Sequence, residues 1–287
     1  MKLFKIALII LLLILTGCME NGQAFTETTS PTTEYTKTIT IIKETPTLQQ
    51  LVLPKSSETE ESVFNIIEVS SPLEDYPLLE IVNLISNQFN PPSPGSDDPH
   101  QGVDFSVIDP TLRIALKGSP IQVILDGKVV MLMSDRFPYG NAVMVETPFE
   151  NLPETWREKL LDISKPESWG KQPALTCPAG WDRPASEMDE LSLYVLYAHL
   201  DNEPDHLMGD EVVSGDKLGE IGDSGNVLAP HLHLEMRIGF TSGLKGSMAH
   251  YDVSAKEEEM ENYCRWRVSG WYRVVDPMDL LSTDPGY

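Results

Sequence analysis

The run LSLYVLYAHL, at residues 191–200, decides the fold class of this chain. It is one of several short runs rich in valine, leucine and isoleucine that are bounded by glycine, proline or aspartate, a pattern typical of β-strands. The others are VDFSVI at 103–108, IQVILD at 121–126, KVVMLM at 128–133, NAVMVE at 141–146 and LHLEMRI at 232–238. Their close succession predicts a mainly β protein with an antiparallel sheet at its core.

Four of the chain's six histidines lie in three short strings next to these runs: HQGVD at 100–104, YAHL at 197–200 and HLHLE at 231–235. His100 and Asp104 are four residues apart, so they share a face if the segment is extended, and Gly102 lets the backbone bend between them. His231 and His233 share a face of one strand for the same reason. A hydrolytic zinc site needs imidazoles and a carboxylate around one point, with one position open to water.

The three strings, in this order, resemble the lysostaphin/LytM-type zinc endopeptidases, which cut peptide bonds in bacterial cell-wall peptidoglycan. The family pattern is His-x-Gly-x-Asp, then Tyr-Ala-His, then His-Leu-His. The resemblance covers roughly 95–240 and includes GSPIQVILDGKVV at 118–130 and SGDKLGEIGDSGNVLAPHLHLE at 214–235. It implies the fold called the duplicated hybrid motif, a two-sheet β-sandwich or barrel-sandwich hybrid with the metal in a groove on one face.

Residue by residue, the resemblance implies that His100, Asp104 and His233 bind one Zn²⁺ per chain. It implies that His231 is the general base and that His199 stabilises the oxyanion. A bound zinc ion lowers the pKa of water to about 7, and a histidine with a reference pKa near 6.5 can accept the released proton at neutral pH.

Neighbouring polar residues have weaker assignments. Glu235 shares a face with His231 and His233 and either orients a ligand imidazole or is a solvated strand residue. Tyr197 is either a core tyrosine, which we favour, or a substrate contact. The remaining candidates are expected at the surface: His206, His250 and the loop charge pair Asp97 and Asp98.

Residues 1–17 are typical of a bacterial lipoprotein signal peptide. Lys2 and Lys5 precede the apolar run 6–15, which is shorter than the roughly 20 residues of a membrane span, and LTGC follows at 15–18. That ending resembles a lipoprotein processing box, with cleavage before Cys18 and acylation of that cysteine. We therefore expect an extracytoplasmic protein, lipid-anchored to the bacterial cell membrane. An uncleaved anchor helix is the alternative.

Residues 18–60 are expected to form a disordered tether, because ten threonines between Thr26 and Thr47 leave little apolar surface to bury. The whole chain of 287 residues carries 44 acidic and 21 basic side chains, a net charge of −23. This balance argues against nucleic acid and against electrostatic binding to anionic lipid. The expected partners are peptidoglycan peptides, and the membrane through the lipid on Cys18.

The catalytic domain is expected over 61–287, with a short N-terminal helix over 71–89, where Leu78, Val82 and Ile85 recur at helical spacing. Two long insertions, near 147–190 and 240–273, interrupt the family pattern. The first is expected to hold a helix near Glu154–Leu161. The second is expected to be an ordered loop. Both either form walls of the substrate groove or serve packing alone.

Each insertion carries one cysteine, Cys177 in the first and Cys264 in the second. In an oxidising compartment an even pair favours a disulfide, which would join the two insertions. Two buried free thiols are the alternative.

Three functions compete. A zinc endopeptidase acting on cell-wall peptides is favoured, because all five motif positions are present. A non-catalytic member of the same fold, which binds peptidoglycan or activates another hydrolase, would typically lack one of them. A structural zinc site would be closed by four protein ligands, and the sequence supplies three.

The signal sequence leads to the first prediction. Substituting Cys18→Ala should leave the precursor unprocessed and unlabelled by a fatty-acid analogue, because no other residue offers the lipid-modified thiol. The control is the wild-type protein, labelled in parallel. Equal labelling of the two proteins would refute the lipoprotein assignment.

Overall fold

The computed structural model describes residues 67–93, 95–163, 176–178 and 190–282. The chain divides into two units, Met1–Glu61 and Ser62–Tyr287, and every described residue belongs to the second. The expected signal peptide, Cys18 and the tether lie outside the described residues. None of the helices in the described ranges is long and apolar enough to cross a membrane.

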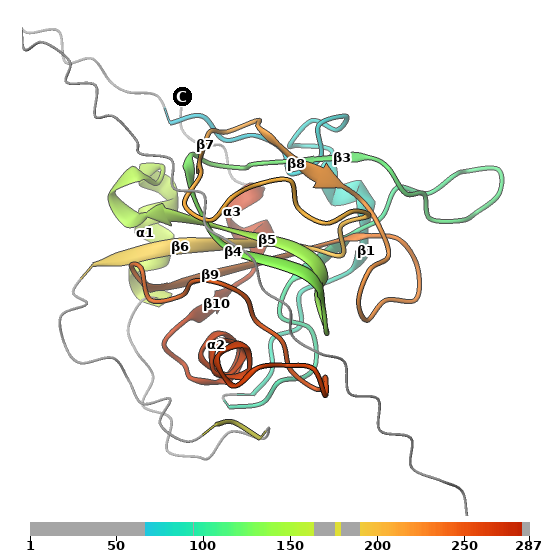
Figure 1. Ribbon diagram of the computed structural model, residues 1–287. Helices are drawn as coiled ribbons and strands as arrows, with labels where there is room; N and C mark the ends of the chain where they lie inside the picture. Colours follow the sequence, from blue (N-terminus) through green and yellow to red (C-terminus); the bar gives the residue numbers. More distant parts are fainter. Residues whose placement is uncertain (1–66, 94, 164–175, 179–189, 283–287) are drawn as a thin grey trace, which may run out of the picture. The chain divides into compact units, whose positions relative to one another are not determined.

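The second unit is built on an eight-stranded antiparallel sheet (Figure 1). The strand order is β1 (Ile85–Asn87), β2 (Val103–Phe105), β9 (Leu232–Phe240), β6 (Leu191–Ala198), β5 (Gly140–Pro148), β4 (Gly127–Arg136) and β7 (Glu211–Val212), with β10 (Arg273–Val275) also paired to β9. A second, two-stranded sheet consists of β3 (Pro120–Gln122) and β8 (Lys217–Glu220). The prediction of a mainly β, antiparallel fold with two sheets is confirmed.

The two faces of the large sheet differ because side chains alternate along each strand. On β9, every second residue points into the main core, and these residues are apolar: Leu232, Leu234, Met236 and Ile238. Residues of the small sheet, Ile121 and Leu218, close this core from the other side. The intervening residues of β9 point to the opposite face, and that face carries the polar site described below.

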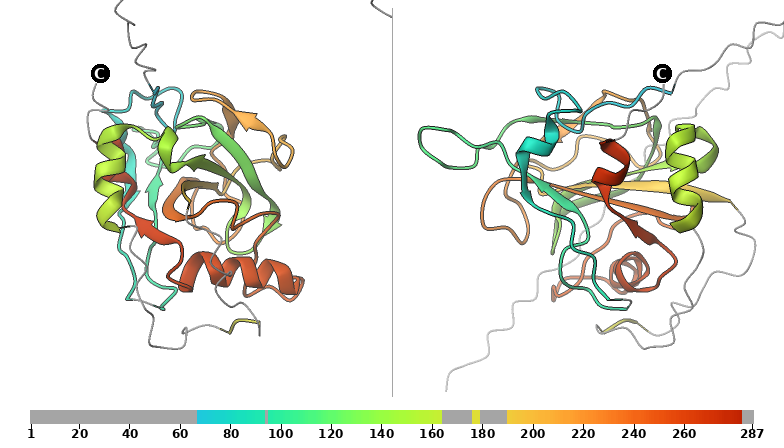
Figure 2. Two further views of the ribbon diagram at one scale, coloured as in Figure 1. Left: turned by 90° about the vertical axis from the view of Figure 1, so that its left-hand side faces the viewer. Right: turned by 180° about the vertical axis from the view of Figure 1, so that it is seen from behind.

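Helices cover both faces of the large sheet (Figure 2). On the apolar face lie α1 (Glu154–Ile163), which buries Trp156 and Leu160, and the short α3 (Pro277–Leu281). On the polar face lies α2 (Glu257–Val268), which packs Trp266 against residues of β6. The 3-10 turns η1 (Ile81–Leu84) and η2 (Phe149–Asn151) complete the elements. The helix expected near Glu154–Leu161 is confirmed.

The helix expected over 71–89 is wrong. Only η1 is helical there, and residues 85–87 form strand β1, with Ile85 opposite Phe105 of β2. Upstream, the backbone lies extended along β3, since Ser70 donates to Ile124 O and Gln122 donates to Pro72 O. These long-range backbone hydrogen bonds override the local helical spacing, and Val82, one of the positions that define that spacing, is exposed.

The segment 240–273 was expected to be an ordered loop, and it contains the twelve-residue helix α2. Its start is marked by Glu257, Glu258 and Glu259, which interact favourably with the positive end of the helix dipole. The Glu259 carboxylate accepts a hydrogen bond from the backbone N–H of Lys256. Arg265 and Arg267 lie in the last turn, where cations are favoured. These charges are the signal that would have predicted the helix.

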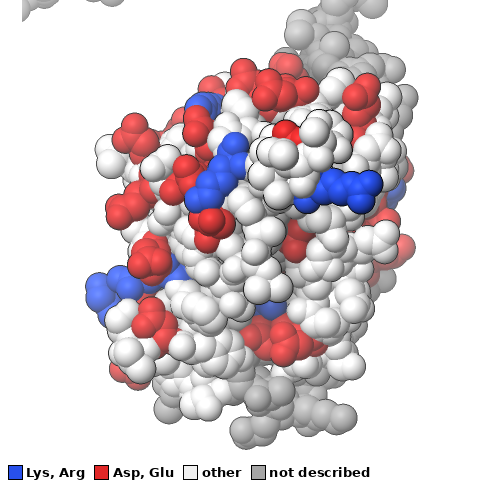
Figure 3. Space-filling model, turned by 90° about the vertical axis from the view of Figure 1, so that its right-hand side faces the viewer, with Lys and Arg blue, Asp and Glu red and all other residues white. Residues whose placement is uncertain are grey.

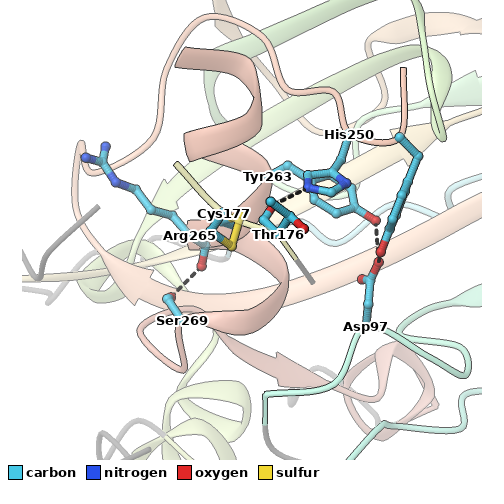
Figure 4. Close-up of a disulfide and its surroundings, with 9 residues drawn as sticks. Asp97, Thr176, Cys177, His250, Tyr263, Arg265 and Ser269 are labelled. Carbon is cyan, nitrogen blue, oxygen red and sulfur yellow. Dashed lines mark hydrogen bonds between the residues drawn. A yellow bond between two sulfur atoms is a disulfide. The ribbon is translucent and has the colours of Figure 1, made fainter. Parts of the chain in front are cut away.

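Cys177 and Cys264 form the expected disulfide, with their Cα atoms 6.0 Å apart (Figure 4). The bond ties residues 176–178 to the middle of α2. Beside it, the imidazole Nε2 of His250 donates to the carbonyl of Thr176 and the ring stacks on Tyr263. The expectation that a disulfide joins the two insertions is confirmed. The rest of the first insertion beyond α1 lies mostly outside the described residues.

Reduction of this disulfide should lower the melting temperature. The bond closes a loop of 87 residues, for which the chain-entropy model gives a stabilisation of about 4–5 kcal/mol, and measured values are often smaller. Calorimetry with and without reductant measures the shift. Thiol counting on the unfolded, unreduced protein is the control: two free thiols in material made in an oxidising compartment would contradict the bond.

Candidate functional site

The strand register brings three potential metal ligands to one point. In the antiparallel pair β2–β9, Asp104 lies directly opposite His233. The Oδ1 atom of Asp104 is 2.9 Å from Nδ1 of His233 and 3.1 Å from Nε2 of His100, and the two imidazole nitrogens are 3.2 Å apart. Ligand atoms at zinc distances of about 2.0–2.1 Å in a tetrahedron lie about 3.3 Å from one another. The three donors therefore fit a small tetrahedral cation.

Hydrogen bonds fix the protonation of the two candidate ligand imidazoles. His100 donates from Nδ1 to the carbonyl of Gln88, 2.8 Å away, so its Nε2 presents a lone pair to the site. His233 directs Nε2 toward the Glu235 carboxylate at 3.4 Å, which leaves Nδ1 for a metal. A carboxylate behind a ligand imidazole fixes the ring and increases its basicity. The side-chain amide of Asn87 donates from Nδ2 to the other carboxylate oxygen of Asp104, Oδ2, at 3.1 Å.

Close packing fixes the backbone between two of these ligands. A Cβ atom at Gly102 would lie 2.5 Å from the carbonyl oxygen of Leu234 and 2.7 Å from the imidazole of His233. No larger residue fits at 102 without displacing β9. Glycine is therefore required here by close approach, and it sets the distance between His100 and the strand that carries His233.

The charges in the site are strongly coupled. Burial alone would raise the pKa of the Asp104 carboxyl, but the close imidazoles of His100 and His233 hold that pKa well below its usual range. Burial alone would lower the pKa of His233, but its hydrogen bonds to Asp104 and Glu235 raise that pKa to about 9. In the metal-free protein these two neighbouring carboxylates therefore favour a proton on His233.

The other two motif histidines lie beside this cluster, and their rings are 4.8 Å apart. His199 follows β6 with a positive φ of 65°, and its backbone N–H donates to Tyr139 O. Its ring donates from Nδ1 to the carbonyl of Ser224, and the ring of His231 donates from Nδ1 to the carbonyl of Ala229, both at 2.8 Å. Each neutral ring therefore has a lone pair on Nε2. Burial and the charges of His233 and His231 lower the pKa of His199 to about 3.

All five motif residues line one cleft of about 740 Å³. One wall is formed by the loops 107–116 and 223–230, which project from the sheet (Figure 1) and carry the exposed apolar side chains Ile108 and Leu228. The other wall includes Tyr251, Tyr263 and Arg267 from the second insertion. On the side where the two loops project, Asp and Glu outnumber Lys and Arg on the surface (Figure 3), in keeping with the negative net charge.

The structure decides between the alternatives that the sequence left open for Glu235 and Tyr197. Glu235 is fully buried next to His233, so the solvated alternative is excluded. Tyr197 is a core residue whose hydroxyl accepts from the Ile124 N–H. Asp98 is exposed, as expected. His206, which was also expected at the surface, is half-buried.

Two of the surface assignments are wrong. His250 is buried against Tyr263 because α2 covers it. Asp97 is largely buried because Arg267, 170 residues away in the sequence, forms an ion pair with it at 2.6 Å. Arg267 and Tyr263 themselves were not singled out from the sequence. In the sequence, neither residue can be distinguished from a surface residue, although Tyr263 adjoins Cys264 and Arg267 follows it by three positions.

Comparisons with known proteins give structural likenesses only. Neither a family model nor a curated protein matches the sequence. Among solved structures, the chain is similar to the catalytic domain of the antimicrobial peptidase lysostaphin from Staphylococcus simulans, with 18% identity, 71% of this chain and 98% of that chain covered, and a TM-score of 0.36. It is also similar to the catalytic domain of the prophage-encoded protein EnpA from Enterococcus faecalis, with 19% identity, 56% and 85% covered, and a TM-score of 0.32.

A third similar structure is a zinc-containing peptidase from Vibrio cholerae, with 21% identity, 53% of this chain and 32% of that chain covered, and a TM-score of 0.29. At these identities and TM-scores the likenesses say nothing about activity.

The raised pKa of His233 predicts pH-dependent metal binding. Its folded-state pKa of about 9 exceeds the ordinary value of 6.5, so between these values the metal-free protein retains a proton that the metal must displace. Zinc affinity should therefore rise with pH, by up to about tenfold per unit for each proton released. Chelator competition between pH 6 and 8.5 measures this, with His233→Ala as the variant expected to lose binding. A flat profile would contradict the prediction.

Proposed function

We propose that this protein is a zinc-dependent endopeptidase, and that its substrates are the peptides of bacterial peptidoglycan. The observation that carries the proposal is the convergence of three ligand atoms within 4.8 Å of one another, from His100, Asp104 and His233, beside two histidines with lone pairs facing the same cleft. The choice of peptide bonds in peptidoglycan rests on the resemblance of the three sequence motifs.

The donor set favours zinc over harder cations. Two imidazole nitrogens and one carboxylate suit Zn²⁺, whereas magnesium and calcium prefer oxygen ligands. Only three protein ligands meet in the described part of the chain. Structural zinc sites are usually closed by four, whereas catalytic sites keep one position for water or substrate. The open position therefore argues against a purely structural metal.

The metal's contribution, when bound, is to polarise the substrate carbonyl and to lower the pKa of a water molecule. His231 is proposed as the general base. Its imidazole lies at the cleft, and its Nε2 is 3.5 Å from Asp104 Oδ1, close enough to reach a water above the ligand cluster. The Nδ1–H bond to Ala229 holds the ring in the tautomer that accepts a proton at Nε2.

His199 is proposed to stabilise the oxyanion of the tetrahedral intermediate, and its hydrogen bonding sets a condition on that role. The Nδ1 hydrogen is committed to Ser224, so the neutral ring has no N–H to offer at Nε2. His199 can donate there only after Nε2 gains a proton. Its lowered pKa keeps it neutral before reaction, and negative charge developing beside it favours transfer of the proton that His231 takes from the attacking water, since the two rings are 4.8 Å apart.

The alternative is a non-catalytic protein that binds peptidoglycan through the same cleft. Such a protein has no need of His199 and His231, whose Nδ1 hydrogen bonds to backbone carbonyls leave the Nε2 atom of each neutral ring unprotonated beside the same cleft. This arrangement favours the enzyme. Attachment to the cell membrane through a lipid on Cys18 is part of the proposal, and it rests on the sequence of residues 1–18 alone.

Digestion of purified peptidoglycan by the zinc-loaded protein, followed by mass spectrometry of the released peptides, tests the proposal and identifies the bond. His231→Ala should retain zinc and reduce the rate about 10²–10⁴-fold, because it removes the base and leaves the ligands in place. His206→Ala, outside the site, is the matched control and should cleave normally. Loss of zinc from His231→Ala would mean that the roles of His231 and His233 are reversed, and absence of any cleavage by the wild type would favour the non-catalytic alternative.

A further inference from the structure

The Glu235 carboxylate, which lies behind His233, is held by two arginines from different parts of the chain. Arg237, two residues along β9, donates from Nε to Glu235 Oε1 at 2.7 Å. Arg267, from α2, donates from Nη1 to Glu235 Oε2 at 3.1 Å, and the Tyr139 hydroxyl donates to the same oxygen at 3.0 Å. Glu235 is fully buried, so these donors replace all of its hydration.

Arg267 also holds the loop that carries His100. Its Nε donates to Asp97 Oδ1 at 2.6 Å and its Nη2 donates to the Asp97 carbonyl at 2.8 Å. Asp97 precedes His100 by three residues, and Gln101 on the same loop donates to the Asp97 carbonyl at 2.8 Å. One planar guanidinium therefore bridges two anions, the Glu235 carboxylate beside His233 and the Asp97 carboxylate on the loop that carries His100. A lysine ammonium cannot reproduce this fork of donors.

The position of Arg267 is secured by its surroundings in the second insertion. Cys264, one helical turn away, is bonded to Cys177 (Figure 4). The hydroxyls of Tyr263 and Tyr251 donate to the second oxygen of Asp97, at 2.9 Å and 3.0 Å. The side chain of Arg267 is only 10% exposed, at the base of the cleft wall.

We propose that Arg267 is a positioning residue of the metal site, which orients His233 through Glu235 and His100 through the Asp97 loop. The inference rests on the proposed function in one respect, namely that His100, Asp104 and His233 bind zinc. It assigns the second insertion a role in the site itself, beyond packing and beyond forming a wall. Residues that orient metal ligands from behind typically contribute a factor of 10–100 to metal affinity.

The decisive measurement is the zinc affinity of Arg267→Met by chelator competition. Methionine keeps much of the buried volume but bridges neither carboxylate, so the affinity should fall about tenfold or more. The absorption bands of the cobalt-substituted protein should also change, because the orientation of two ligands is altered. Arg265→Met is the matched control: Arg265 lies on the same helix, is ion-paired with Glu261, and makes no contact with Asp97 or Glu235 among the described interactions. It should bind zinc as the wild type does.

Two further variants keep the test decisive. If Arg267→Met does not fold, Arg267→Lys decides, since it retains the charge without the fork and should still weaken zinc binding several-fold. If Arg267 acts through Glu235 and the Asp97 loop, then Arg267→Met added to Glu235→Gln should cost less than the product of the two separate losses. Wild-type zinc affinity and an unchanged cobalt spectrum in a folded Arg267→Met or Arg267→Lys protein would overturn the proposal.

These outcomes are separable from those of the proposed function. A wild-type protein that binds zinc but cleaves no peptide would refute the endopeptidase and leave the Arg267 measurement valid. A wild-type protein that binds no zinc would refute both proposals together.

Discussion

The pairing of β2 with β9 is the constraint on which the site depends. It sets Asp104 opposite His233, with Val103 opposite Leu234 and Phe105 opposite Leu232. Because side chains alternate across a strand, a slip of one residue would bury Asp104 in the apolar core and expose Phe105 on the polar face. The apolar neighbours of Asp104 and His233 therefore specify the geometry of the candidate metal site, since their burial fixes the register.

The polar face of the large sheet is unusual because it carries charged side chains that are buried. Glu235 and Arg237 are both almost fully buried there, beneath α2. Buried ions are costly unless they are paired, and here the Glu235 carboxylate meets two guanidinium groups, each of which donates to at least three acceptors. The helix that covers these charges thus excludes water from the rear of the site, while the front remains open to the cleft.

The sequence was informative where the pattern is local. Short apolar runs bounded by glycine, proline or aspartate predicted β4, β5, β6 and β9, and the three short motifs contain the five polar residues that line one cleft. Features that depend on contacts between distant segments were not predicted correctly from the sequence. The helical spacing within 71–89 did not produce the expected helix, because the start of this segment forms backbone hydrogen bonds with β3. Asp97 was expected to be a surface charge because its partner, Arg267, lies 170 residues away in the sequence. The helix α2 was missed because its buried side is held by a disulfide and by polar groups, so it lacks a simple apolar stripe.

The separation of the ligands along the chain has a consequence for folding. Asp104 and His233 are 129 residues apart, so the metal site exists only after the two strands that carry them have been brought together. Contacts of such long range are slow to form, because the entropy of closing the intervening loop is lost before the contact is gained. Zinc therefore cannot nucleate the fold. In the proposed function it stabilises the finished sheet by mass action, and the free zinc concentration sets how rarely a folded molecule reopens.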